Sequence, residues 1–180
     1  MIPISETELL TLHWIQYGFI NRKYVLFSGD HPVASLRWIK SKIPHAIGET
    51  ADNRWIFQSS RLLYPRVSIK SGEADQLEAT FEATMKGHGK LTFTDGRNFH
   101  WLSTDFWNNE WVFTDAQGER LIQFIPEQGL FKIGAALNLE PQVLSLPELP
   151  LLAVTGWYLL VNINEQDGDL SSLASAVRVK

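Results

Sequence analysis

Short hydrophobic runs separated by turn residues recur from about residue 11 to residue 140, and many of them carry apolar side chains at every second position. In residues 77–83, Leu, Ala, Phe and Ala alternate with Glu, Thr and Glu, which puts the two sets on opposite faces of a strand. About ten to twelve such strands follow one another at a spacing of roughly eight to twelve residues. The pattern predicts a mainly β protein, either an antiparallel sandwich or a barrel.

Two segments show the β-hairpin pattern most clearly, because each places a turn containing Asp and Gly between two apolar strands. The first is YVLFSGDHPVASL, in which residues 29–32 form the turn. The second is WVFTDAQGERLI, in which residues 115–118 form the turn. We therefore expect a hairpin at each of these places.

The segment LPELPLLAVTGWYLLVNIN, residues 146–164, departs from the two-residue period and is apolar on almost every side. Pro147 and Pro150 suit the start and the first turn of a helix, so the pattern predicts a helix over about residues 147–164. A helix without a polar face must be surrounded. Its apolar run of roughly 13 to 15 residues is too short for a bilayer, which needs about 20, so we expect protein around it.

A barrel of matching height would enclose this helix. About 15 helical residues span roughly 22 Å, close to the height of a barrel made from strands of six or seven residues. The sequence therefore predicts one domain over residues 1–180, a closed antiparallel β-barrel of about 10–12 strands enclosing a hydrophobic C-terminal α-helix, with a tail from residue 165. In the helix, Gly156 would let a bulky barrel side chain approach, and Thr155 would hydrogen-bond back to its own helix.

The helical segment of residues 146–164 follows two strand-turn-strand units, YVLFSGDHPVASLRW and EWVFTDAQGERLIQF. Together these segments resemble the tubby C-terminal superfamily. That superfamily includes tubby domains, phospholipid scramblases and the LURP-one-related proteins of plants, and the resemblance covers about residues 20–165. It implies a barrel whose lumen holds the hydrophobic helix. Tubby domains bind phosphoinositide headgroups with clustered basic residues, whereas the basic residues here are dispersed. Scramblases place an acidic calcium-binding segment beside the last helix, but Glu140 and Glu148 are the only acids between residues 130 and 160, so that activity does not carry over.

Composition narrows the classes of function. Seven Trp and ten Phe suit a large pleated core. A formal charge of −4 gives no overall attraction for nucleic acid. The absence of cysteine excludes disulfides and thiolate chemistry. Glu6 and Glu8 stand where a signal peptide would need a basic start and an apolar run, so we expect a cytoplasmic protein that is not transmembrane.

No catalytic or metal-binding pattern stands out in the sequence. The five histidines lack metal-ligand spacing, and no serine lies in a G-x-S-x-G setting. Residues 87–89 and 95–96 are interpreted as turns, because a phosphate-binding loop would be followed by a helix. Glu78 and Glu82 alternate with apolar residues as on an exposed strand face, which argues against a glycosidase pair. The sequence predicts no cofactor, no metal site and no enzyme active site.

One segment is a candidate for contact with a membrane. Arg37, Trp38, Lys40 and Lys42 combine cations with an aromatic ring, a mixture that suits an anionic lipid surface. The alternative is a solvated strand end whose lysines protect the edge of a sheet.

A second segment is a candidate for contact with a partner protein. Phe106, Trp107 and Trp111 surround Asn108 and Asn109, as in a protein or sugar contact. The alternative is that one or two of these rings belong to the core and the two asparagines form a turn.

These observations favour a non-catalytic binding or scaffold module whose ligand is a lipid surface or another protein. Two alternatives remain open. The first is a lipocalin-like carrier with an open lumen and an amphipathic helix packed outside. The second is a hydrolase with a cleft on the rim of the barrel, whose catalytic residues come from distant parts of the chain. The sequence does not fix the oligomeric state.

Overall fold

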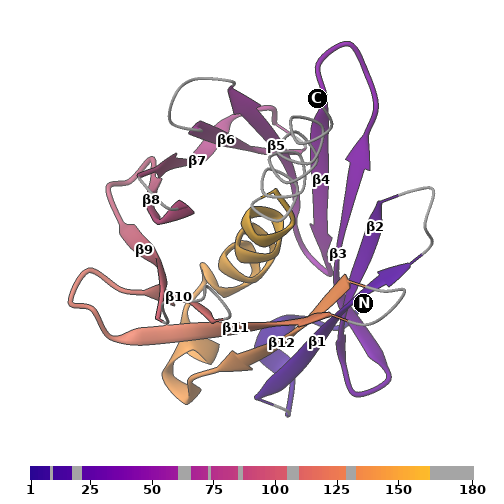
Figure 1. The fold of residues 1–180 in the computed structure, drawn as a ribbon, viewed down its shortest axis with the longest axis vertical. Coiled ribbons are helices and arrows are strands. Elements are labelled where there is room, and N and C mark those ends of the chain that lie inside the picture. The colour runs from indigo at the N-terminus through magenta and orange to yellow at the C-terminus, as the bar shows by residue number, and fades with distance from the viewer. Residues whose placement is uncertain are drawn as a thin grey trace, which may run out of the picture.

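The computed structural model describes residues 1–8, 10–17, 22–60, 66–72, 74–84, 87–104, 110–128 and 133–162 of the chain. Twelve strands in these ranges form a closed antiparallel barrel, in which each strand pairs with its neighbours in the sequence and β12 pairs with β1. Figure 1 shows this ring of strands around a helix. The strands are β1 (Thr11–Tyr17), β2 (Lys23–Ser28), β3 (His31–Ile39), β4 (His45–Thr50), β5 (Arg54–Ser60), β6 (Arg66–Ser71), β7 (Leu77–Ala83), β8 (Gly89–Phe93), β9 (Asn98–Ser103), β10 (Trp111–Thr114), β11 (Arg120–Gln128) and β12 (Ile133–Leu139).

Both hairpins predicted from the sequence are present, as β2–β3 and β10–β11. In the β10–β11 turn, the Asp115 carboxylate accepts hydrogen bonds from the backbone N–H groups of Gln117 and Glu119, each at 2.9 Å. Gly118 takes a φ of 88°, a conformation that L side chains rarely adopt. The Asp and Gly of this turn therefore have direct structural roles.

Alternation along the strands divides the barrel wall into an inner and an outer face. In β1, Leu12 and Trp14 are buried, whereas Thr11, His13 and Ile15 are exposed. Because successive side chains of a strand point to opposite sides, the buried set faces the lumen. The predicted mainly β fold with a closed antiparallel barrel is confirmed.

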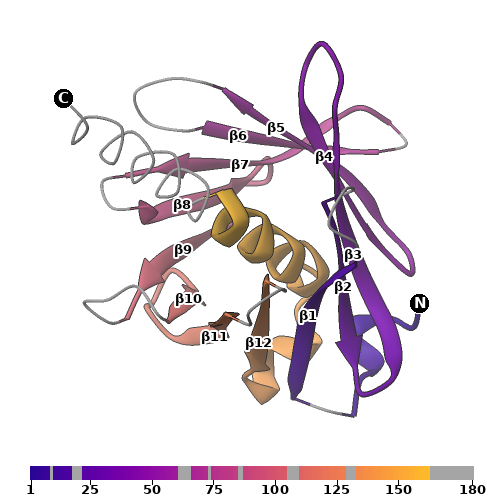
Figure 2. The ribbon, with the colours of Figure 1, turned by 45° about the vertical axis from the view of Figure 1, so that its right-hand side comes forward.

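The C-terminal helix, residues 149–162, lies inside the barrel, as Figures 1 and 2 show from two directions. All residues from 149 to 161 are buried except Pro150, which is half-buried. The predicted enclosed helix is thus confirmed, although residues 163–164 and the predicted tail lie outside the described residues. The described helix begins two residues later than predicted, because residues 141–148 first form the 3-10 helix η3 (Pro141–Ser145) and a turn. No helix in the described ranges is long and apolar enough to cross a bilayer.

Aromatic side chains of the barrel wall reach the helix from more than one side. Trp157 of the helix stacks on Trp14 of β1, with ring centroids 5.6 Å apart. The next helical residue, Tyr158, stacks on Trp38 of β3 at 5.8 Å and on Phe57 of β5 at 4.9 Å. Aromatic pairs of this kind contribute about 0.5–1.5 kcal/mol beyond the burial of their area. The helix is therefore held in place by specific contacts as well as by its hydrophobicity.

The barrel and the helix approach each other most closely at two glycines. A Cβ atom at Gly156 of the helix would lie 2.6 Å from Cε2 of Phe124 on β11, and one at Gly48 on β4 would lie 2.5 Å from Cγ1 of Val154 in the helix. The predicted close approach of a bulky barrel side chain at Gly156 is confirmed. The prediction for Thr155 was wrong, because its buried hydroxyl oxygen has no hydrogen-bond partner among the described residues.

Candidate functional site

The antiparallel strand order sorts the connections between strands into two ends of the barrel. The β2–β3, β4–β5, β6–β7, β8–β9 and β10–β11 turns lie at the end where the helix begins. Described acidic side chains predominate in this half, which we call the acidic end. Its basic residues are Arg54, Lys70, Arg97 and Arg120, and its acidic residues are Glu6, Glu8, Asp30, Glu49, Asp52, Asp75, Glu78, Asp95, Asp115, Glu119, Glu140 and Glu148.

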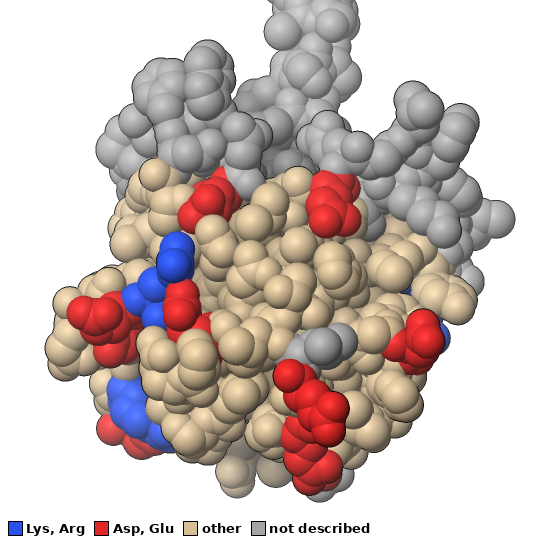
Figure 3. Space-filling view, turned by 90° about the horizontal axis from the view of Figure 1, so that it is seen from below, with Lys and Arg blue, Asp and Glu red and all other residues tan. Residues whose placement is uncertain are grey.

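The opposite half, where the helix ends, has the reverse balance, and we call it the basic end. Its described acidic residues are Glu82, Glu110 and Glu127, and its described basic residues are Arg22, Lys23, Arg37, Lys40, Lys42, Arg66 and Lys90. This distribution of charged residues complements the dipole of the helix, because a helix carries partial positive charge at its N-terminus, here at the acidic end, and partial negative charge at its C-terminus, here at the basic end. Figure 3 shows one face of the molecule on which acidic groups predominate and the visible basic groups lie beside them.

The predicted membrane-binding residues are brought together only in part. Arg37 on β3 faces outward opposite Lys23 of β2 in the strand register. Lys40 and Lys42 are exposed in the connection between β3 and β4. Trp38 has a different environment, because its ring packs against the buried helix. The three cations therefore lie on the outside of the barrel, whereas the Trp38 ring faces the helix inside it.

The connection between β3 and β4 also exposes a large apolar side chain. Ile43 is 67% exposed. Its carbonyl oxygen accepts a hydrogen bond from the Ser41 hydroxyl at 2.5 Å and lies 3.0 Å from Nδ1 of His45, which fixes the turn. Tyr17, 60% exposed, stands opposite Lys23 in the register of β1 and β2. We call the set Tyr17, Lys23, Arg37, Lys40, Lys42 and Ile43 the basic surface.

The second predicted contact segment falls partly outside the described residues, since Phe106 and Trp107 both lie there. Trp111, the first residue of β10, is only 1% exposed. Its ring stacks on Trp101 of β9, with centroids 5.3 Å apart. Trp111 thus belongs to the core, as the alternative interpretation of this segment expected.

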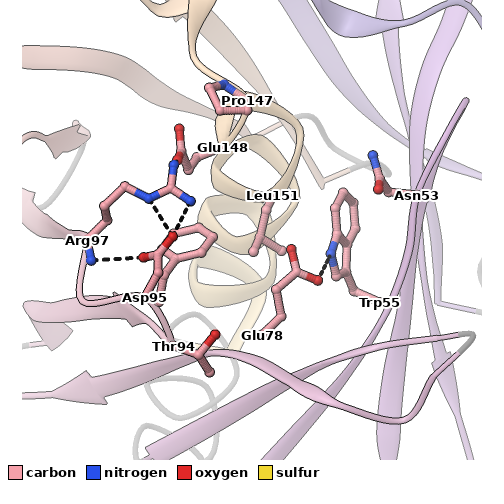
Figure 4. A pocket seen from close by; sticks show the side chains of 10 residues that line it. Asn53, Trp55, Glu78, Thr94, Asp95, Arg97, Pro147, Glu148 and Leu151 are labelled. Atoms are coloured by element: carbon pink, nitrogen blue, oxygen red, sulfur yellow. Dashed lines mark hydrogen bonds and ion pairs between the residues drawn. The ribbon is translucent and has the colours of Figure 1, made fainter.

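A pocket of about 220 Å³ lies at the acidic end, next to the start of the helix. Its walls come from β5, β7, the end of β8, the β4–β5 and β8–β9 turns and the beginning of the helix with the turn before it. Figure 4 shows two groups of polar side chains in it. One group is Arg97 with Asp95 and Glu148, and the other is Trp55 with Glu78.

Arg97 connects the β8–β9 turn to the helix. Its Nε donates to Oδ2 of Asp95 at 2.8 Å, and its backbone N–H donates to Oδ1 at 3.0 Å. The Arg97 side-chain hydrogen bond, together with the backbone bond, lowers the pKa of Asp95 below its usual 3.8, and the pKa of Arg97 is raised in turn. The guanidinium also forms an ion pair with the carboxylate of Glu148, a residue that is only 4% exposed. The backbone carbonyl of Glu148 accepts the first hydrogen bond of the helix, from the N–H of Leu152. Arg97 therefore fixes the start of the helix to the barrel wall.

Glu78 forms the other polar group of the pocket. Its Oε2 accepts a hydrogen bond of 2.9 Å from the indole Nε1 of Trp55, which is 3% exposed. The sequence pattern placed Glu78 and Glu82 together on an exposed face, but only Glu82 is exposed, whereas Glu78 is half-buried. The register of β6 and β7 shifts between Ile69 and Lys70, beside Glu78, and such a shift changes the direction of a neighbouring side chain.

Within the described ranges, no group of three or more His, Asp or Glu side chains is arranged to hold a metal ion. Comparisons with protein-family models, with curated proteins and with solved structures return no match. Any assignment of function therefore rests on the geometry of the basic surface and of the pocket.

Neither Ile43 nor Arg97 was predicted from the sequence as a site residue. For Ile43 a signal existed, because it is a large apolar residue that directly follows Lys40, Ser41 and Lys42. For Arg97 there was none, since its partner Glu148 lies far away in the chain and only the closed barrel brings the two together.

Proposed function

We propose that this chain is a non-catalytic, tubby-like binding module that docks on an anionic membrane through its basic surface. The observation that carries the proposal is Ile43, 67% exposed in a turn that also exposes Lys40 and Lys42. An apolar side chain at such a turn can enter the headgroup region while neighbouring cations meet anionic lipid. The resemblance of the sequence to the tubby superfamily supports only the class of binding module and not the lipid ligand, because the basic residues are dispersed along the sequence.

The position of the helix supports binding on the outer surface. A carrier of lipocalin type needs an open lumen, but here residues 149–161 fill that space. The hydrolase alternative stays a prediction. Its best cleft would be the pocket, whose carboxylates at Asp95 and Glu78 are already hydrogen-bonded to Arg97 and Trp55.

The expected affinity is modest. Lys23, Lys40 and Lys42 would contribute about 1 kcal/mol each near an anionic surface. Burial of Ile43 would add about 2 kcal/mol. The sum of about 5 kcal/mol corresponds to a dissociation constant of roughly 0.2 mM. Arg37 would add less than a free cation, because its Nη2 lies 3.8 Å from Oε1 of Glu49.

Vesicle co-sedimentation tests this proposal directly. The protein should sediment with vesicles rich in phosphatidylserine and stay in the supernatant with pure phosphatidylcholine. Lys42→Glu and Ile43→Ser should each weaken sedimentation, the first by removing a cation and the second by removing the apolar contact. Raising the salt concentration should weaken binding further, since exposed charges are screened.

Lys90→Glu is the matched control, because Lys90 is also exposed at the basic end but lies on β8, away from the basic surface. It makes the same change of charge as Lys42→Glu and should reduce binding much less. Equal losses in the two variants would show attraction by net charge alone. Equal or absent sedimentation with both lipids would contradict the proposal.

A further inference from the structure

The pocket at the acidic end has no part in the proposed membrane contact, since it lies at the opposite end of the barrel from the basic surface. We propose that it binds a small organic cation, an ammonium or guanidinium group carried on a short apolar stem. The proposal is independent of the proposed function.

The charges in the pocket select the sign of the ligand. Its walls carry the carboxylates of Glu78, Asp95 and Glu148 but only the guanidinium of Arg97. Arg97 is shared between Asp95 and Glu148. Glu78 is bonded to a neutral group, the Trp55 indole. Glu78 has no cationic partner among the ion pairs of the described residues. A half-buried carboxylate in this state is unfavourable, and a cation entering beside Glu78 would offset the cost.

The remaining walls suit a short apolar stem. Trp55, Phe93 and Leu151 line the pocket together with the polar groups. Ammonium and guanidinium groups are attracted to the faces of aromatic rings, and Arg97 already lies over Phe93, with Cζ 5.5 Å from the ring centroid. The volume of about 220 Å³ equals that of roughly seven water molecules at ~30 Å³ each, which suits a ligand the size of a lysine or arginine side chain.

The surroundings of the pocket favour the same kind of ligand. Acidic side chains predominate over the whole acidic end, and such a field raises the local concentration of cations. An anion would gain little from Arg97, because the positive charge of Arg97 is already balanced by the carboxylates of Asp95 and Glu148. A bare metal ion would lack ligands, because no suitable group of three is found in the described ranges.

An NMR titration that follows the indole N–H signal of Trp55 tests the proposal at the site, with the signal assigned through Trp55→Phe. Agmatine and butylammonium should shift this signal to saturation, and neutral butanol should not. Glu78→Gln keeps a hydrogen-bond acceptor for Trp55 but removes the charge, and it should weaken binding of both cations about tenfold. Glu78→Lys, which places an ammonium group of the protein itself in the pocket, should abolish binding.

The matched control is Glu82→Gln, on the same strand but exposed and outside the pocket, where it pairs with Arg66 at 3.6 Å. It should change the affinity by less than about twofold. Thermal melting of each variant confirms that it is folded. A blocked Gly-Arg-Gly peptide distinguishes a cation carried by a partner protein from a free small molecule. If the peptide binds like agmatine, the ligand is a side chain of a partner protein. If only agmatine binds, the ligand is a free small molecule. Unchanged affinity in Glu78→Gln, equal binding of butanol, or no shift with either cation would overturn the proposal.

Discussion

Gly156→Ala tests whether the helix is packed tightly against the barrel wall. In an exposed helix, Ala is about 1 kcal/mol more favourable than Gly, so the substitution would stabilise the protein. Here the added Cβ would lie 2.6 and 2.7 Å from Cε2 and Cε1 of Phe124. Carbon atoms in favourable contact are about 3.5–4.0 Å apart, so either the ring or the helix must shift.

Phe124 has little room to move. It is fully buried, and its ring meets Trp101 at 5.2 Å and Phe113 at 6.3 Å between centroids. Adding a methyl group to a well-packed core costs about 1–3 kcal/mol. The contacts of 2.6 and 2.7 Å put Gly156→Ala in the upper part of this range, about 2–3 kcal/mol, so after subtraction of the gain in helix propensity of about 1 kcal/mol it should lower the free energy of unfolding by about 1–2 kcal/mol. For a chain of this size, the melting temperature should fall by about 3–6 °C.

Urea denaturation followed by far-UV circular dichroism measures this change. The control is Gly156→Ala in a Phe124→Leu background, where the smaller side chain leaves space for the methyl group. In that background the substitution should cost less than about 0.5 kcal/mol, so the double-mutant cycle should show strong coupling. Stabilisation by Gly156→Ala in the otherwise unchanged protein would refute the close packing.

Other predictions concern the helix and its attachment to the barrel wall. Trp157→Ala removes a ring that stacks on Trp14 and should lower the free energy of unfolding by about 3–5 kcal/mol, whereas Tyr17→Ala, at an exposed position, should change it by less than about 0.5 kcal/mol in the same urea experiment. Arg97→Ala leaves the buried carboxylate of Glu148 without its ion pair, so scanning calorimetry should show a lower melting temperature, and adding Glu148→Gln should restore part of the loss. The pKa of Asp95 is lowered in the folded state, so its carboxylate stabilises the fold above the usual value of 3.8 and this contribution disappears as the pH falls through the lower folded-state pKa. The difference in melting temperature between the unchanged protein and Asp95→Asn should therefore be present at pH 6, begin to shrink below about pH 3.8 and disappear once the pH is below the lower folded-state pKa. A difference that stays constant as the pH falls would contradict this assignment.

The sequence was sufficient to predict the barrel, because its signals are local. Alternation in the strands, turn residues such as Asp115 and Gly118, and the apolar character of residues 149–161 each depend on neighbours in the chain. Even the close approach at Gly156 could be inferred, since a glycine in a buried helix leaves space for a side chain from outside.

The candidate sites were much harder to predict. The pocket joins Glu78, Arg97 and Glu148, which come from separate parts of the chain and meet only after the barrel closes around the start of the helix. In the basic segment, alternation alone separates Arg37 on the outside from Trp38 on the inside. The composition of that segment suggested one shared surface, but the period of the strand divides it between two faces.

The enclosure of the helix by the barrel is the central claim, and native-state hydrogen exchange of the amides of residues 152–161 tests it most directly. A helix surrounded by the barrel can exchange only when the whole barrel opens, so these amides should exchange with the free energy of global unfolding measured in urea. If they exchange with a free energy several kcal/mol lower while strands such as β1 and β11 remain protected, the helix leaves an intact barrel, which would contradict the claim.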